Sequence, residues 1–351
     1  MPTPPPTDTL NLLIATYLEP EYIEQIRAIS PRLHVVYRPD LIPSARYAAD
    51  HYNTITRTPE QEAEWRDLLA QADLMFDFDP THRADLPELA PRVRWIQASS
   101  AGIGQFVHRQ QYDTRMPQTI FTTASGIHAR PLAEFCCMAI LMFTRGALHT
   151  LQLQRQRRWE RYAGTDLEGR TLGILGVGRI GAEVARMAGA LGLRVIGTKR
   201  TIAGVDPASL FLDQLYPLDQ LDQMLAQCDF FVIVTPHTGE TERLIGAQQL
   251  AQLPRGTVLI NIGRGAVVDE AALIAALQSG HLGGAALDVF EVEPLPNESP
   301  LWDLPNVLVS PHSGSTTDRE NGRLVALYCE NLRRYLAGEP LRNVLDTTLL
   351  Y

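Results

Sequence analysis

An apolar run leads directly into a glycine-rich turn near the middle of the chain. Residues 171–181 read TLGILGVGRIG, and a helix-forming stretch follows them. Gly176 allows a tight turn, Gly178 lets the backbone approach a pyrophosphate, and Gly181 lets the helix pack closely on the strand. The start of the helix offers free N–H groups and a positive dipole to a phosphate. This strand–turn–helix context predicts dinucleotide binding, against the alternative of a purely structural glycine turn.

The end of the next predicted strand indicates which dinucleotide is bound. An NAD-type site usually carries an acidic residue about 20 positions after the glycine motif, to hold the ribose 2′-hydroxyl. Between Arg179 and Arg200 the only acidic residue is Glu183, which lies within the predicted helix. Lys199 and Arg200 follow Thr198 instead, and two cations suit a 2′-phosphate. The sequence therefore predicts NADP in preference to NAD; the alternative is that both cations are ordinary loop charges.

Short apolar runs alternate with longer amphipathic stretches on both sides of this motif. Such alternation is typical of parallel sheets covered by helices on both faces. The predicted strands are 11–16, 33–37, 74–78, 93–97, 119–122, 171–175, 193–197, 230–235, 257–262, 284–288 and 307–310. The predicted helices include 21–29, 60–71, 180–191, 270–278 and about 318–336, with a long helical stretch over 129–162 that breaks around 145–150.

The length of 351 residues corresponds to about two domains. The predicted fold class is α/β, with two Rossmann-like, doubly wound parallel-sheet domains. Residues 125–316 are expected to form the NAD(P)-binding domain. This domain is inserted into a discontinuous, flavodoxin-like substrate domain of residues 1–124 and 317–351, so that the cleft between the two domains would hold the substrate.

Composition excludes several other classes of protein. Formal net charge is −9, which argues against binding to nucleic acid or to an acidic membrane surface. The four cysteines form no CxxC pair, so neither a metal site nor a disulfide framework is expected. No run of 18 apolar residues is present, and the opening MPTPPPT resembles a short disordered leader more than a signal peptide. We expect a cytoplasmic protein without a membrane or nucleic-acid partner.

Three polar residues follow predicted strands in the second half of the chain. Arg264 follows 257–262, Glu293 follows 284–288, and His312 follows 307–310. In open α/β sheets ligands bind outside the carboxyl ends of the strands. The three side chains are therefore candidates for one active site.

Four segments occur in an order that resembles a known enzyme family. They read GILGVGRIG, NIGRGAVVDE, ALDVFEVEPLP and SPHSGSTT, and they are similar to motifs of the D-isomer-specific 2-hydroxyacid dehydrogenases. The resemblance spans roughly residues 90–340. It implies that Arg264 binds the substrate carboxylate and polarises the carbonyl, and that His312 is the general acid/base. It also implies that Glu293 pairs with this histidine, favours the imidazolium and orients the ring.

The resemblance also implies the remaining contacts of substrate and cofactor. The loop after strand 93–97 is expected to present backbone N–H groups to the substrate carboxylate, although the family often has an acidic residue where Gly104 stands. The implied substrate-binding residues are Ser99, Ser100, Ala101, Gly102 and Arg264. The implied cofactor-binding residues are Gly176, Gly178, Arg179, Ile180, Gly181, Thr198, Lys199, Arg200, Thr235, Pro236, Ile262, Gly263, Asp288 and Gly314.

The expected activity is NAD(P)-dependent interconversion of a small 2-oxo acid, of the glyoxylate or hydroxypyruvate type, and its D-2-hydroxy acid. One alternative is a short 3-phosphoglycerate dehydrogenase; another is a dinucleotide-sensing, corepressor-like binding protein. Family habit implies a homodimer, and the helical stretch 129–162 is suited to packing against a partner subunit. Its four arginines between 155 and 161 are expected to lie on a solvated or subunit-packing face, the alternative being a phosphate-binding patch.

Overall fold

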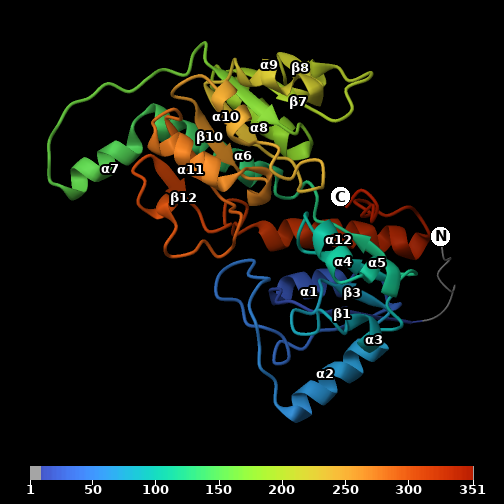
Figure 1. Ribbon diagram of the computed structural model, residues 1–351. Coiled ribbons are helices and arrows are strands. Elements are labelled where there is room, and N and C mark those ends of the chain that lie inside the picture. Colours follow the sequence, from blue (N-terminus) through green and yellow to red (C-terminus); the bar gives the residue numbers. More distant parts are fainter. Residues whose placement is uncertain (1–8, 351) are drawn as a thin grey trace. The chain divides into compact units, whose positions relative to one another are not determined.

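The computed structural model describes residues 9–350, so the predicted leader 1–7 lies outside the described residues. The chain forms two compact units (Figure 1). Unit 1 contains the chain up to Ile127 and the chain from Thr316 onward, and unit 2 is His128–Ser315. Each unit is built on a parallel sheet, of five strands in unit 1 and seven in unit 2, which confirms the predicted α/β class.

Unit 1 has the strand order β2-β1-β3-β4-β5, and every neighbouring pair is parallel. This is the flavodoxin-like order, in which the direction of winding reverses between β1 and β3. The strands are β1 (Leu10–Ile14), β2 (Leu33–Val36), β3 (Leu74–Phe76), β4 (Trp95–Gln97) and β5 (Ile120–Thr122). The helices are α1 (Pro20–Arg27), α2 (Pro59–Gln71), α3 (Leu86–Leu89), α4 (Gly104–Arg109), α5 (Tyr112–Arg115) and α12 (Glu320–Ala337).

The two faces of the unit 1 sheet bury separate apolar cores, because successive strand residues point to opposite sides. Leu12 and Phe76 pack on one face with α1 and with Tyr328 of α12. Leu13 and Met75 pack on the other face with α2 and α4. The last helix of the chain therefore completes the core of the first unit.

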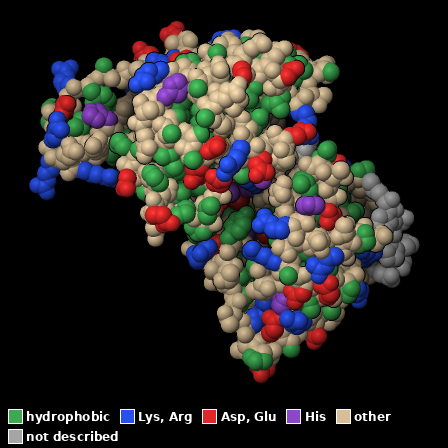
Figure 2. All heavy atoms as spheres, viewed as in Figure 1, with side chains coloured by type: hydrophobic (Ala, Val, Ile, Leu, Met, Phe, Trp, Pro, Cys, Tyr) green, Lys and Arg blue, Asp and Glu red, His purple; other side chains and the backbone are tan. Residues whose placement is uncertain are grey.

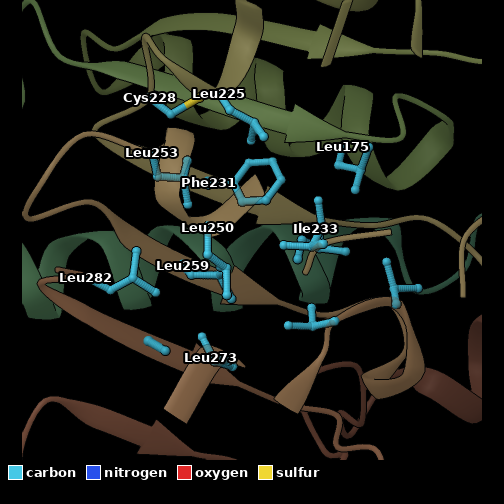
Figure 3. Packing of buried hydrophobic residues seen from close by; sticks show 14 of the residues in the cluster. Leu175, Leu225, Cys228, Phe231, Ile233, Leu250, Leu253, Leu259, Leu273 and Leu282 are labelled. Atoms are coloured by element: carbon cyan, nitrogen blue, oxygen red, sulfur yellow. The ribbon is translucent and has the colours of Figure 1, made fainter. Parts of the chain in front are cut away.

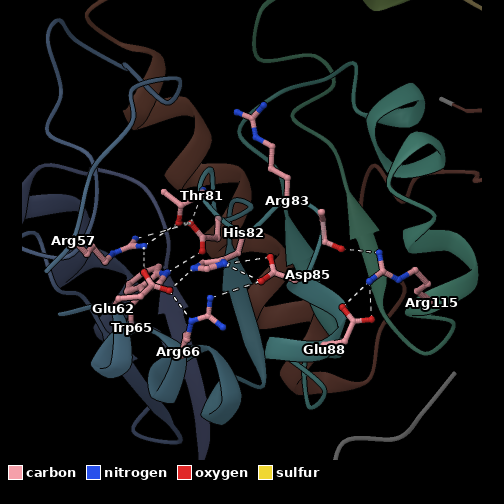
Figure 4. Close-up of polar contacts among 12 residues, drawn as sticks. Arg57, Glu62, Trp65, Arg66, Thr81, His82, Arg83, Asp85, Glu88 and Arg115 are labelled. Atoms are coloured by element: carbon pink, nitrogen blue, oxygen red, sulfur yellow. Dashed lines mark hydrogen bonds and ion pairs between the residues drawn. The ribbon is translucent and has the colours of Figure 1, made fainter. Parts of the chain in front are cut away.

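A polar cluster ties the long loop before α2 to the segment after β3 (Figure 4). The Arg57 guanidinium lies over the Trp65 ring at 4.5 Å, and Trp65 Nε1 donates to Asp79 Oδ2 at 2.9 Å. His82 lies between two carboxylates, with Nε2 2.7 Å from Glu62 Oε1 and Nδ1 3.1 Å from Asp85 Oδ2. These contacts hold the segment that follows β3 on α2.

Unit 2 has the strand order β12-β11-β10-β9-β6-β7-β8, again with parallel neighbours. Counted along unit 2 this is the Rossmann order 3-2-1-4-5-6 with one further strand, and winding reverses between β6 and β9. The strands are β6 (Thr171–Leu175), β7 (Arg194–Thr198), β8 (Gln214–Tyr216), β9 (Phe230–Ile233), β10 (Val258–Asn261), β11 (Gly284–Leu287) and β12 (Val307–Val309). The α-helices are α6 (Ala129–Thr144), α7 (Ala147–Arg155), α8 (Arg179–Ala190), α9 (Leu221–Leu225), α10 (Ala247–Gln252) and α11 (Glu270–Gln278). Short 3₁₀ turns are η1 (Pro207–Leu210), η2 (Leu218–Gln220), η3 (Gly265–Val267) and η4 (Pro300–Trp302).

Helices cover both faces of the unit 2 sheet. Figure 3 shows Phe231 and Leu259 of the sheet packed with Leu250 of α10 and Leu273 of α11. On the other face, α6 and α8 pack on alternate residues of the same strands. Among the described residues no single helix is long and apolar enough to span a membrane. The pair α6 and α7, bent by 63°, meets the length and composition criteria only when the two are counted together.

The predicted helical stretch 129–162 is only partly helical. It breaks as expected at Gly146, whose φ of +65° is left-handed, but α7 ends at Arg155. Arg157 ends this helix with a φ of +55°, and Arg158 N–H donates to Leu153 O. A left-handed end usually carries glycine, so an arginine there gives no stop signal. Residues 156–170 form no helix or strand, and with α7 they make an arm whose end is rich in cationic side chains (Figure 2).

Candidate active site

The glycine turn joins β6 to α8 at the carboxyl edge of the unit 2 sheet. Gly176 has a φ of +96°, and a Cβ there would lie 2.7 Å from Thr235 Cγ2. Gly178 is the N-cap of α8, and a Cβ on it would meet no heavy atom of the described residues within 4 Å. Open space therefore lies before the first helical residues, Arg179 and Ile180, where backbone N–H groups can receive a phosphate.

The residues after β7 are anchored to this turn. The Thr198 carbonyl accepts N–H groups of the glycine turn at 2.9 and 3.2 Å. Lys199 is the only lysine in the sequence, and its Nζ donates to Val177 O at 3.1 Å. Arg200 forms an ion pair with Glu240. The two cations predicted to bind a 2′-phosphate thus stand at the carboxyl end of the strand beside the glycine turn.

The ends of β9 and β10 complete the sheet edge beside the turn. The buried Thr235 Oγ1 has no hydrogen-bond partner within residues 9–350, and Pro236 follows it directly. A Cβ on Gly263 would lie 2.8 Å from Thr235 O, so the two strand ends meet backbone to backbone, next to the buried Ile262. A buried hydroxyl without a partner is costly unless a ligand satisfies it. This hydroxyl and the open space over Gly178 fit a bound dinucleotide.

Asp288 holds the loop that carries His312. Its Oδ1 accepts hydrogen bonds from Ser310 Oγ at 2.5 Å and from the N–H groups of Ser313 and Gly314, both at 2.9 Å. Burial raises the pKa of the Asp288 carboxyl, and these hydrogen bonds oppose the rise. The side chain lies at the carboxyl end of β11, and its predicted contact with the cofactor stays a prediction.

His312 and Glu293 form a hydrogen-bonded pair. Their Nδ1 and Oε2 atoms are 2.7 Å apart, and the Phe290 N–H donates to the other carboxylate oxygen at 3.0 Å. Burial works to raise the pKa of Glu293. The hydrogen bonds from His312 and Phe290 and the nearby charges of His312 and Arg264 outweigh burial, so this pKa is lowered. The carboxylate is therefore ionised near neutral pH and can accept a hydrogen bond from Nδ1, so Nε2 is the ring nitrogen that does not contact Glu293.

Arg264 lies one strand away from this pair. It follows β10, and β10 is the neighbour of β11, after which Glu293 comes. Arg264 Nη1 donates to Gly263 O at 2.7 Å, and the guanidinium charge acts on Glu293. The three predicted catalytic residues thus lie on adjacent strand ends of one unit.

Two positioning residues in this region were not predicted from the sequence. Asn261 binds the Arg264 turn on both sides: its Nδ2 donates to Arg264 O at 3.2 Å, and its Oδ1 accepts Gly263 N–H at 3.0 Å. A Cβ on Gly265 would lie 1.9 Å from the Phe290 carbonyl. Gly265 therefore lets the Arg264 turn touch the backbone that carries Glu293. An asparagine at a strand end often accepts the N–H two residues further on, and this turn signal could have revealed the first of them.

The predicted carboxylate loop lies in unit 1, after β4. Ser99 is buried, and its hydroxyl donates to Asp77 Oδ2 at 2.5 Å and its N–H to Asp77 Oδ1 at 3.3 Å. Gly102 N–H donates to Ser100 Oγ at 3.3 Å. In the described chain, the Ala101 N–H makes no such bond. Asp77, with a left-handed φ of +65°, is the support that sequence reasoning missed.

The fold leaves no room for a side chain at Gly104. A Cβ on this residue would lie 1.9 Å from Leu350 O, because the last described residues of the chain pack against the start of α4. A neighbouring segment, Val344 to Leu345, runs antiparallel beside β5. An acidic side chain at position 104 would not fit this arrangement.

Comparisons with known proteins identify the family of the chain. The profile described as "D-isomer specific 2-hydroxyacid dehydrogenase, NAD binding domain" matches residues 137–314. A glyoxylate/hydroxypyruvate reductase B of Pectobacterium carotovorum is 34% identical over 87% of this chain and 95% of its own length. A D-isomer specific 2-hydroxyacid dehydrogenase of Xanthobacter autotrophicus, solved with NADPH, superimposes with a TM-score of 0.75 at 31% identity, covering 97% of this chain and 100% of the other. An NADPH-dependent glyoxylate/hydroxypyruvate reductase of Sinorhizobium meliloti, solved with NADP, gives 0.76 at 26% identity and the same coverage. The chain belongs to the D-isomer specific 2-hydroxyacid dehydrogenase family.

Proposed function

We propose that this protein is an NADPH-preferring reductase that converts a small 2-oxo acid of the glyoxylate or hydroxypyruvate type into its D-2-hydroxy acid. The observation that carries the proposal is the 2.7 Å pair of His312 and Glu293, with Arg264 on the neighbouring strand end. The Pectobacterium and Sinorhizobium proteins are named for glyoxylate and hydroxypyruvate reduction, which supports this substrate class.

The proposed reaction divides the work between these side chains. Bound NADPH would supply a hydride to the carbonyl carbon of the substrate. The Arg264 guanidinium, a fork of charged donors, binds the carboxylate and polarises the carbonyl. His312 gives its Nε2 proton to the carbonyl oxygen, because Nδ1 is held by the Glu293 carboxylate. In the oxidation direction Nε2 takes the proton back from the hydroxyl.

A substrate panel tests the activity. Oxidation of NADPH and NADH is followed with glyoxylate, hydroxypyruvate and 3-phosphohydroxypyruvate, and we expect the first two to be reduced faster, with NADPH preferred. A preference for the phosphorylated acid would favour the short 3-phosphoglycerate dehydrogenase. Tight cofactor binding without any turnover would favour the corepressor-like protein. His312→Gln should abolish reduction while cofactor affinity stays near that of the wild type.

The preference for NADP rests on Lys199 and Arg200. Because Lys199 is the only lysine, amine acetylation followed by intact mass reports on it directly, beside the N-terminal amine. We expect NADPH to protect Lys199 from acetylation and NADH to protect it much less. Equal protection by both cofactors would contradict a 2′-phosphate contact.

We also propose that the arm, α7 with residues 156–170, packs on a second copy of the chain. Trp159 is 98% exposed and Leu151 is half-exposed, so the arm offers apolar surface that a partner would cover. The arginines around Trp159 suit a partner with a net charge of −9. Light scattering on Trp159→Ser against wild type tests the proposal, with a dimer expected for the wild type and a weaker one for the variant.

A further inference from the structure

An ion pair crosses the carboxyl edge of the unit 2 sheet directly above the glycine turn. In the strand order, β6 lies between β9 and β7. Arg200 follows β7, whereas Glu240 belongs to the loop after β9. The pair that they form therefore spans the end of β6, where Gly176 and Gly178 make their turn. This is the point at which winding reverses, where ligands of such sheets bind.

The pair is exposed, with side-chain accessibilities of 46% for Arg200 and 67% for Glu240. Exposed ion pairs contribute little to stability, because water solvates both ions well when they separate. The pair can therefore open at small cost when a ligand offers Arg200 a better partner. A phosphate is such a partner, since a guanidinium binds it through two parallel hydrogen bonds.

Lys199 and Arg200 differ in the charge of the group that each contacts. Lys199 Nζ donates to a backbone carbonyl, which carries no net charge, and Lys199 forms no ion pair within residues 9–350. Arg200 faces a full carboxylate. The three side chains together present one net positive charge to a 2′-phosphate, and they would present two if Glu240 were neutral.

We propose that Glu240 is a specificity-determining residue that competes with the 2′-phosphate of NADPH for Arg200. It narrows the preference for NADPH over NADH, because NADH carries only a hydroxyl at this position and does not need Arg200. The inference rests on the proposed contact of Lys199 and Arg200 with the 2′-phosphate. Glu240 lies 40 residues along the chain from Arg200, so the sequence at the end of β7 does not reveal it.

Calorimetric titration of the intact protein with NADPH and NADH tests the inference without turnover. In Glu240→Gln we expect the ratio of Kd(NADH) to Kd(NADPH) to rise about fivefold, near the most that an exposed ion pair contributes. The affinity of Glu240→Gln for adenosine 2′-monophosphate, which lacks the nicotinamide, should rise over that of the wild type by a similar factor. Glu242→Gln is the matched control, since Glu242 lies on the same loop and contacts His237 rather than Arg200. Its ratio should stay within twofold of wild type.

The Arg200→Gln variant distinguishes a failure of the proposed 2′-phosphate contact from a failure of the role proposed for Glu240. If Arg200→Gln leaves NADPH affinity unchanged, the proposed 2′-phosphate contact at Arg200 is wrong. If Arg200→Gln weakens NADPH but Glu240→Gln shifts the ratio by less than twofold, NADP binding stands and the role of Glu240 is overturned. In the double variant the effect of Glu240→Gln should disappear, because the carboxylate then has no guanidinium to occupy. A persistent fivefold gain there would also overturn competition for Arg200.

Discussion

Replacing Glu293 by Gln removes one negative charge from the candidate site and keeps a side chain of nearly the same shape. Glu293 Oε2 lies 2.7 Å from His312 Nδ1, and the carbonyl oxygen of Gln can still accept that hydrogen bond. The change therefore isolates the electrostatic part of the pair. The proton that reduction needs resides on His312, and the carboxylate charge favours the protonated ring.

The structure bounds the size of the effect. Two unit charges about 4 Å apart interact by about 4 kcal/mol at an effective dielectric constant near 20. The side chains of His312 and Glu293 are 46% and 36% exposed, so water screens much of this interaction. We take about 1.4 kcal/mol as the interaction that remains after screening, which equals a factor of ten in rate.

The assay is kcat/KM for reduction of the best 2-oxo acid between pH 5 and 10. The pKa of Glu293 lies below its ordinary value, so the carboxylate is ionised over this whole range. We expect kcat/KM to be about tenfold lower in Glu293→Gln than in the wild type, because the charge beside His312 is lost. Glu291→Gln, on the same turn but paired with Arg243, should keep the wild-type profile. An unchanged kcat/KM in Glu293→Gln, or an equal loss in both variants, would contradict the proposed role of the carboxylate charge.

Two further predictions concern stability. Gly265→Ala should lower the free energy of unfolding by about 1–3 kcal/mol and also reduce kcat/KM, because its Cβ would collide with the backbone at 290–291. Gly189→Ala, on an open face of α8, should be neutral or stabilising by up to about 1 kcal/mol in the same denaturant titration. The Arg46 hydrogen bond lowers the pKa of the buried Asp50 from 3.8 to about 2. A lowered folded pKa gives stability that is present above pH 4 and lost as pH falls toward 2. Asp50→Asn should therefore flatten this part of the stability profile by about 1–2 kcal/mol, and an unchanged profile would count against the pair.

Hydrophobic patterning predicted the two sheets well because their strands are buried on both faces and read as continuous apolar runs. Patterning failed where that cause is absent. The edge strand β8 has three residues, Gln214–Tyr216, of which the first is exposed, so it left no apolar run to detect. The end of α7 was placed too late because Arg157 takes the left-handed position that glycine usually marks.

In the candidate site, too, residues at strand ends could be predicted and those that depend on loop conformation could not. Arg264, Glu293 and His312 could be predicted as neighbours, because parallel strands bring their carboxyl ends to one edge. The residues that support the site could not be predicted, since Asp77 and Asn261 each act through a pair of hydrogen bonds whose partners depend on how loops close. Such contacts have no periodicity and leave no pattern along the chain.

Two cations of the candidate site are held in a way that fits a chain with a net charge of −9. Lys199 and Arg264 are aimed by backbone carbonyls, at 3.1 and 2.7 Å, which fixes a side chain without cancelling its charge. Neither carbonyl cancels the charge of its partner, and each side chain loses less conformational freedom on binding an anion. Arg200 is aimed by a carboxylate instead, so its charge is available only when the partner is displaced. A backbone carbonyl and a carboxylate can thus both hold a cationic side chain in place, but only the carboxylate neutralises its charge. Arg200 is therefore the cation for which a ligand must compete with a protein group, Glu240.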